Sequence, residues 1–97
     1  MRIWLDDIRD APMGFIHCHS VNEAIRVILE HESKSHIELI DCDHDLGDYA
    51  HDGGDGIKLI DWLVERGTFY PINLHTMNPV GRDNMQRTID RYWPSLM

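Results

Sequence analysis

The chain has 97 residues, 42% of them hydrophobic, and a net charge of −8. This length gives room for one small domain with a core near the lower limit for unaided folding, so we expect residues 1–97 to form a single domain. Acidic residues outnumber basic residues by 17 to 9, which excludes extended nucleic-acid binding because such binding requires many neutralised phosphates.

The cysteines and the apolar runs indicate the compartment. Cys18 and Cys42 both lie in strand-like runs and no C-x-x-C motif occurs, so we expect reduced thiols in the core of a cytoplasmic protein. The sequence shows no signal peptide and no apolar run of membrane-spanning length. We also expect no membrane partner.

The first half of the chain reads as two strands and a helix. Residues 2–5 form a short apolar strand, and a polar segment rich in turn residues follows it. Residues 15–19 form a second strand. Ser20 is placed to cap a helix, with Glu23 three positions later as in a capping box. The apolar positions of that helix form one stripe and are Val21, Ala24, Ile25, Ile28 and Leu29.

The second half repeats the alternation of strand and helix. Residues 37–42 form a third strand, and the glycine-rich and aspartate-rich loop 46–56 is expected to be mobile or ordered by metal and to lie outside the core. A helix over residues 56–66 ends at Gly67, and a fourth strand covers residues 71–75. Asn78 and Pro79 start the last helix, and Pro94 ends it. The inner stripe of this helix contains Met85, Ile89, Tyr92 and Trp93, of which the last two are expected to belong to the core.

Strands that alternate with helices predict an α/β fold with a mostly parallel sheet and right-handed crossovers. Apolar and polar residues alternate along these strands, whereas a sheet buried on both faces has continuous apolar strands. We therefore expect three helices largely on one face, with the other face either wet or used for self-association. Trp4, Phe15 and Ile40 fall in the polar phase and are candidates for a homodimer contact.

Acidic residues follow two of the predicted strands. Asp6 and Asp7 follow the first strand, and Asp41, Asp43 and Asp45 lie at the end of the third. Ligands in open α/β sheets bind at the carboxyl ends of the strands, and clustered carboxylates repel unless a cation lies between them. We predict Mg²⁺ or Mn²⁺ held by Asp6, Asp7 and Asp43, with Asp45 as a fourth ligand or a base. Asp41 is expected to be structural.

Histidine and arginine residues near these acids supply the other expected functions. His44, Asp45 and His75 are the predicted catalytic residues, because histidine titrates near neutrality and suits acid–base work on a phosphate. Arginine grips phosphate through two hydrogen bonds, and free amides at a helix start attract anions. The predicted phosphate-binding residues are Arg9, Asn78 and Arg82. The alternatives are that Asp6 and Asp7 cap a turn, that the histidines, His51 included, bind loop carbonyls, and that Arg82 is solvated.

Three segments carry a family resemblance: Leu-Asp-Asp-Ile-Arg at 5–9, Asp-His-Asp-Leu-Gly at 43–47, and His-Thr-Met-Asn-Pro-Val-Gly-Arg-Asp-Asn-Met at 75–85. The chain resembles a truncated receiver, a flavodoxin-like domain, in which Asp6 and Asp7 match the acidic metal-binding pair and Asp43 the phospho-accepting aspartate. It lacks the receiver's first helix, fifth strand and essential lysine. It is more similar to the cyclic-phosphate-processing receiver-like domains of bacteria and phages. The resemblance implies about four strands in the order 2-1-3-4.

That resemblance implies a metal-dependent phosphoesterase that opens or hydrolyses cyclic phosphates, either 2′,3′-cyclic phosphate ends of RNA or cyclic nucleotides. RNA repair or phage–host conflict would be its setting, in the cytoplasm of a bacterial cell or a phage-infected host. The partner would be a phosphate-containing small molecule or an RNA terminus. The alternative is a non-catalytic, degenerate receiver that binds metal, nucleotide or protein. A dehalogenase-like phosphatase needs its Asp-x-Asp motif on the first strand, and an EF-hand loop needs a glutamate at position twelve, so both fit poorly.

Overall fold

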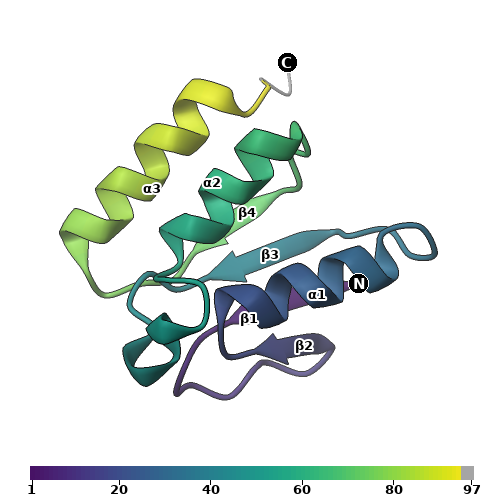
Figure 1. Cartoon of the computed structure of the whole chain (residues 1–97), viewed down its shortest axis with the longest axis horizontal. Helices are drawn as coiled ribbons and strands as arrows, with labels where there is room; N and C mark the ends of the chain where they lie inside the picture. Colours follow the sequence, from purple (N-terminus) through teal and green to yellow (C-terminus); the bar gives the residue numbers. More distant parts are fainter. Residues whose placement is uncertain (95–97) are drawn as a thin grey trace.

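The computed structural model describes residues 1–94 as a four-stranded sheet covered by helices. The elements follow one another in chain order, and the strands and α-helices among them are labelled in Figure 1. They are β1 (Arg2–Leu5), β2 (Phe15–Cys18), α1 (Val21–His31), β3 (Leu39–Cys42), the 3₁₀ helix η1 (Gly47–His51), α2 (Ile57–Arg66), β4 (Ile72–Leu74) and α3 (Pro79–Tyr92). The predicted alternation of strands and helices is confirmed, with strand ends shifted by one or two residues.

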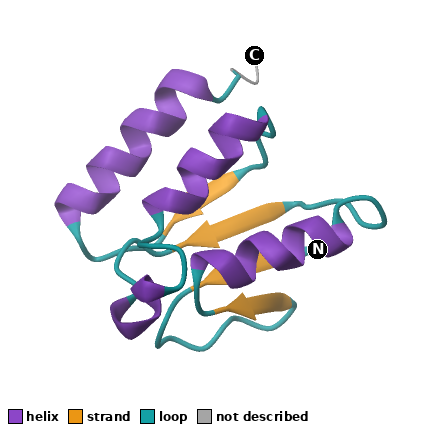
Figure 2. Cartoon of the chain, viewed as in Figure 1, coloured by secondary structure: helices purple, strands orange, loops and turns teal. Residues whose placement is uncertain are grey.

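All strand pairs are parallel and the strand order is β2-β1-β3-β4, as expected. Helices α1 and α2 lie over the same face of the sheet, and α3 packs against α2 (Figure 2). The carboxyl ends of β1, β3 and β4 meet at one edge, below which the loop after β3 emerges (Figure 1). This arrangement gathers the segments that begin at Asp6, Asp43 and His75.

The helix ends follow local sequence signals. Ser20 accepts a hydrogen bond from the amide of Glu23 at 3.1 Å, so it caps α1. Gly67 has a φ of 70°, the left-handed conformation that ends α2. Asn78 caps α3 by accepting from the amide of Gly81 at 3.1 Å, with Pro79 at the first helical position. All three predicted helix boundaries depend on residues close in sequence. None of the helices within residues 1–94 has the length and apolar character that a membrane crossing requires.

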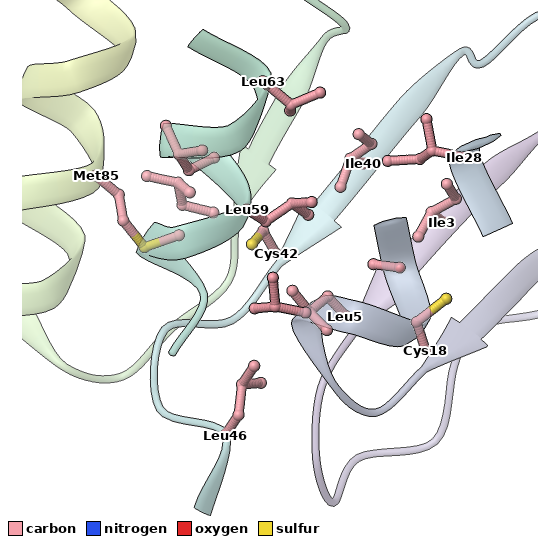
Figure 3. Close-up of a cluster of buried hydrophobic side chains, with 14 of the residues drawn as sticks. Ile3, Leu5, Cys18, Ile28, Ile40, Cys42, Leu46, Leu59, Leu63 and Met85 are labelled. Atoms are coloured by element: carbon pink, nitrogen blue, oxygen red, sulfur yellow. The ribbon is translucent and has the colours of Figure 1, made fainter. Parts of the chain in front are cut away.

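The core lies between the sheet and the helices (Figure 3). Cys18 and Cys42 are free, fully buried thiols within it, as predicted. Burial raises the pKa of Cys18 to about 12 and that of Cys42 further still, so neither is a reactive thiolate. Trp93 packs against this core, but Tyr92 is 44% exposed, so the expected burial of the aromatic pair is wrong for Tyr92.

The uncovered face of the sheet differs from the prediction at β3. Ile40 pairs with Ile3 and is fully buried under the helices, so it is not a dimer candidate. The strict alternation fails between Ile37 and Ile40, which are three positions apart and both buried, because regular strand geometry begins only at Leu39. Trp4 and Phe15 are half-buried and their rings meet edge to face, 6.1 Å apart. The homodimer contact stays a prediction, now without Ile40.

The loop after β3 is anchored, which corrects its expected separation from the core. Leu46 is fully buried among the core side chains. Asp52 accepts hydrogen bonds from Ser20 Oγ at 2.6 Å and from Asn22 Nδ2 at 3.1 Å, so it ties the loop to the start of α1. Asp55 accepts from the amide of Leu46 at 3.1 Å. Asp52 and Asp55 therefore fix the course of this loop through hydrogen bonds.

A cluster at the other end of the sheet joins α1, α2 and the segment before β4. Glu32 contacts Arg66 at 2.6 and 3.1 Å and accepts a hydrogen bond from the Tyr70 hydroxyl at 2.7 Å. The hydrogen bonds from Arg66 and Tyr70 hold the pKa of Glu32 below its usual value. Burial, and then the Glu32 carboxylate, raise the pKa of Tyr70 to about 12.

This cluster gives a pH prediction. Absorbance titration should show one tyrosine that ionises near pH 12, and Glu32→Gln should lower the pKa of Tyr70 toward the ordinary tyrosine value of about 10. The Glu32 contribution to stability should be present above its unfolded pKa and be lost as pH falls through the lowered folded value. The Tyr70 contribution should be lost as pH rises through about 12. An unchanged pKa of Tyr70 in Glu32→Gln would contradict the cluster.

Candidate metal and phosphate site

A cleft of about 430 Å³ opens at the carboxyl ends of the strands. Its walls come from the segment after β1, the segment after β3 and the segment after β4. The lining residues are Asp6, Asp7, Ile8, Arg9, Asp43, Asp45, Gly47, Thr76, Met77 and Asn78. Most of the predicted site residues therefore meet in one place, as parallel strands require. His44, His75 and Arg82 are not part of this lining.

The two carboxylate oxygens of Asp6 have different hydrogen-bond partners. Oδ1 accepts hydrogen bonds from the amides of Ile8 and Arg9 at 2.9 and 2.8 Å, which closes a tight turn after β1. Oδ2 lies 2.9 Å from Nε2 of His75. Burial opposes the charge, but these hydrogen bonds outweigh it and hold the pKa of Asp6 below its usual value. Asp6 thus caps the turn and presents an anionic oxygen to His75.

Asp43 follows β3 and is 8% exposed. It accepts hydrogen bonds from the amide of His44 at 2.8 Å and from the Thr76 side chain. Burial, together with the nearby Asp6 carboxylate, nevertheless raises the pKa of Asp43. Two acids that repel each other in a poorly solvated place are stabilised by a positive charge between them. This electrostatic environment suits a cation.

His75 lies across the uncovered face of the sheet. Its ring stacks on the indole of Trp4, with centroids 3.9 Å apart and planes 3° apart. Nδ1 lies 2.7 Å from Oδ1 of Asp41, and Nε2 faces Asp6. Each ring nitrogen of His75 therefore lies within hydrogen-bond distance of a carboxylate oxygen. Neither nitrogen is free in the way expected of an acid–base catalyst.

One oxygen each from Asp6 and Asp43 and one nitrogen from His75 lie within 4.8 Å of one another. Two ligands about 2.1 Å from an octahedral ion and at right angles to each other are about 3 Å apart, and the separation of 2.9 Å between His75 Nε2 and Asp6 Oδ2 matches this value. The donor set differs from the predicted one, because His75 joins it and Asp7 does not. Asp7 lines the cleft beside Gly47, where an added Cβ would lie 2.6 Å from its Oδ2.

Asp45 and His44 form a hydrogen-bonded pair at the rim. His44 Nδ1 lies 2.8 Å from Oδ1 of Asp45, and Asn78 Nδ2 donates to both oxygens of Asp45 at 3.2 Å. These contacts from His44 and Asn78 hold the pKa of Asp45 below its usual value. The His44 ring lies against Gly81, where an added Cβ would be 2.4 Å from it. Asp45 faces the cleft, and His44 lies behind it.

The three predicted phosphate-binding residues are placed differently. Arg9 lines the cleft, and its Nη1 donates to the carbonyl of His75 at 3.4 Å. Asn78 lines it as well, with its side chain engaged by Asp45 and the cap of α3. Arg82 donates from Nη1 to the carbonyl of Leu74 at 3.1 Å and lies outside the lining. The structure therefore brings Arg9 and Asn78 to the cleft and leaves Arg82 beside β4.

Comparison with known families gives one match. A family model described as a cyclic-phosphate processing receiver domain matches residues 1–91, which is nearly the whole chain. The chain belongs to the cyclic-phosphate processing receiver domains. No curated protein and no solved structure gave a match.

Three residues of this cyclic-phosphate processing receiver domain matter more at the site than their sequence positions indicated. Thr76 is 7% exposed and hydrogen-bonds Asp43, and Asp41 and Trp4 hold the His75 ring. Asp41 pairs with Trp4 and Asn73 in the strand register, so these side chains share the uncovered face. The sequence signal for this arrangement was Asp41 itself. A carboxylate within an apolar strand needs a hydrogen-bond or charge partner, so a polar neighbour was to be expected there.

Proposed function

We propose that this domain is a metal-dependent phosphoesterase that opens 2′,3′-cyclic phosphates, at RNA ends or in small nucleotides, during RNA repair or phage–host conflict. The observation that supports this proposal most directly is the group formed by Asp6, Asp43 and His75. Their donor atoms lie within 4.8 Å of one another, beside a cleft that Arg9 lines. Membership of the cyclic-phosphate processing family supports the substrate class.

The charges of the site support a small phosphate ligand over a long nucleic acid. The cleft contains four aspartates and one arginine among its lining residues, and the chain as a whole carries −8. Such a cleft repels phosphate unless a cation neutralises the carboxylates. Phosphate binding should therefore depend on the metal, and contact should be limited to one terminal nucleotide.

The reaction consumes one water. The water oxygen bonds to phosphorus, one of the two ring P–O bonds breaks, and the departing ribose oxygen takes a proton, which leaves a phosphomonoester. A divalent ion held by Asp6, Asp43 and His75 would polarise a phosphoryl oxygen. Arg9 would hold a non-bridging oxygen. Asp45 lines the same cleft, so its carboxylate would orient the attacking water and accept its proton.

The test is an RNA oligonucleotide that ends in a 2′,3′-cyclic phosphate, incubated with the full chain and Mn²⁺ or Mg²⁺. We expect a monoester by ³¹P NMR, and no monoester when a chelator removes the metal. Arg9→Gln should raise KM about tenfold or more, because it removes a charged hydrogen bond to phosphate, whereas Arg87→Gln on the exposed side of α3 should leave KM unchanged. A set of 3′,5′-cyclic nucleotides tests the breadth of the substrate class.

The same experiment separates the enzyme from a non-catalytic binding module. A monoester product with metal supports the phosphoesterase. If the RNA end binds in a metal-dependent way but stays cyclic under every condition, the catalytic proposal is wrong and the domain is a receptor for cyclic ends. Binding and turnover are measured on the same preparations, so a protein that binds the RNA end without opening it is distinguished directly from an active enzyme.

A further inference from the structure

We propose that His75 Nε2 is a direct ligand of the ion, and that the site therefore selects a divalent transition ion such as Mn²⁺ over Mg²⁺. This inference rests on the metal dependence proposed above and deepens it. The acidic motifs after the strands predict only oxygen donors, whereas His75 adds a nitrogen donor.

The ring of His75 is oriented from two sides. Nδ1 lies 2.7 Å from Oδ1 of Asp41, on β3, and this contact would keep the ring proton on Nδ1 when Nε2, which faces away from Asp41, binds an ion. Trp4, on β1, stacks on the ring face with planes 3° apart and prevents rotation out of this plane. The His75 side chain is only 12% exposed, so the surrounding residues leave its ring few other orientations. A carboxylate that fixes the far nitrogen is the usual support of a metal-binding histidine.

The oriented nitrogen points to the two acids that need a cation. Nε2 lies 2.9 Å from Oδ2 of Asp6, the separation of about 3 Å expected for adjacent ligands of an octahedral ion. An oxygen of Asp43 completes the triangle within 4.8 Å. The cluster is thus more than a group of acids, because a nearly buried histidine with a dedicated hydrogen-bond partner is directed into it.

The donor set determines which ion is preferred. Mg²⁺ favours oxygen ligands and retains several waters, so a nitrogen in its coordination shell is unfavourable. Imidazole nitrogen suits first-row transition ions, which also take carboxylate oxygens. One histidine and two aspartates would therefore bind Mn²⁺ more tightly than Mg²⁺, whereas three aspartates would give little preference.

Asp41 is accordingly a positioning residue. It lies outside the cleft lining and acts by holding the tautomer and the orientation of the His75 ring. Asn73 also donates to Oδ1 of Asp41 at 3.1 Å, which fixes the carboxylate itself. Loss of such an outer partner typically reduces metal affinity by about 10-fold to 100-fold. Asp41→Asn should fall in this range for Mn²⁺.

The decisive measurement is pulsed electron paramagnetic resonance of Mn²⁺ bound to the full chain. We expect modulation from one coordinated ¹⁴N, and a shift to the ¹⁵N pattern when the protein is grown with ¹⁵N-histidine. The isotope experiment uses the unaltered protein, so it does not depend on whether a variant folds. In calorimetry, we expect Mn²⁺ to bind at least about tenfold more tightly than Mg²⁺.

Two histidine variants test whether the nitrogen modulation comes from His75. His75→Gln should abolish the nitrogen modulation and the preference for Mn²⁺, while His36→Gln, at an exposed position outside the cleft, should change neither. Mn²⁺ binding without nitrogen modulation, or equal affinity for both ions, overturns the histidine ligand and leaves the phosphoesterase proposal intact. Nitrogen-coupled Mn²⁺ in a protein that opens no cyclic phosphate supports the ligand and overturns the phosphoesterase.

Discussion

Asparagine in place of Asp43 is expected to slow the opening of 2′,3′-cyclic phosphate ends by about 100-fold or more, because one anionic ligand of the ion is lost. The amide oxygen of asparagine can still accept from the His44 amide, so the local backbone keeps its hydrogen bond. The substitution therefore removes charge at the site with little change of shape.

The same substitution should stabilise the metal-free domain. Burial and the neighbouring Asp6 carboxylate raise the pKa of Asp43, so its ionised form is unfavourable at neutral pH in the folded state. A neutral side chain removes this penalty. Thermal unfolding in the presence of a chelator should give a higher Tm for Asp43→Asn than for the unaltered protein, and added Mn²⁺ should raise the Tm of the unaltered protein but not that of Asp43→Asn.

Asp83→Asn is the matched control, since it removes the same charge from an exposed position on α3. It should leave turnover, metal response and Tm nearly unchanged. Turnover of Asp43→Asn close to that of the control would show that Asp43 does not hold the ion. A lower Tm for Asp43→Asn without metal would contradict the electrostatic account of the site.

Gly56→Ala is expected to reduce the free energy of unfolding by about 3 kcal/mol and to disturb the site, through overpacking of backbone against side chain. Gly56 has an ordinary helical φ of −54°, so no special backbone conformation requires glycine there. The requirement is space, because an added Cβ would lie 1.9 Å from the carbonyl oxygen of Asp43. The Gly56 amide also donates to the carbonyl of His44 at 2.7 Å, which holds the two segments together.

The effect should combine lost stability with a displaced Asp43. A loss of about 3 kcal/mol corresponds to a fall in Tm of about 15 °C for a domain of this size. Mn²⁺ affinity should fall in the same variant, because the backbone that carries Asp43 must move. Gly14→Ala is the comparison: Gly14 has a φ of 88° but no atom near the added Cβ, so only the conformational cost of about 1 kcal/mol applies.

Denaturant unfolding at fixed pH measures both glycine variants on one scale. A Gly56→Ala protein no less stable than Gly14→Ala would show that the segments after β3 and before α2 can separate without cost. In that case, the position of Asp43 would depend on the ion and not on the fold. The predicted order, with Gly56→Ala the more damaging, follows from the close approach of two backbone segments.

Local signals in the sequence determined the elements and their ends. Ser20 and Asn78 cap their helices and Gly67 ends one, because each acts on amides or dihedral angles within a few residues. The alternation of strands and helices determined the parallel sheet, and with it the meeting of the segments that start at Asp6 and Asp43. These inferences needed no distant contact.

The tertiary structure alone decided what surrounds His75. Its partners Asp41, Asp6 and Trp4 are 34 or more residues away, and they meet it only because β3 aligns Asp41 beside Trp4 of β1. The strand pattern did not predict this register. It placed Ile40 on the uncovered face, whereas Ile40 is fully buried under the helices. The reason is that one irregular residue before Leu39 shifts every following side chain to the opposite face. The sequence thus determined which acids share an edge, and the register decided which histidine nitrogen joins them.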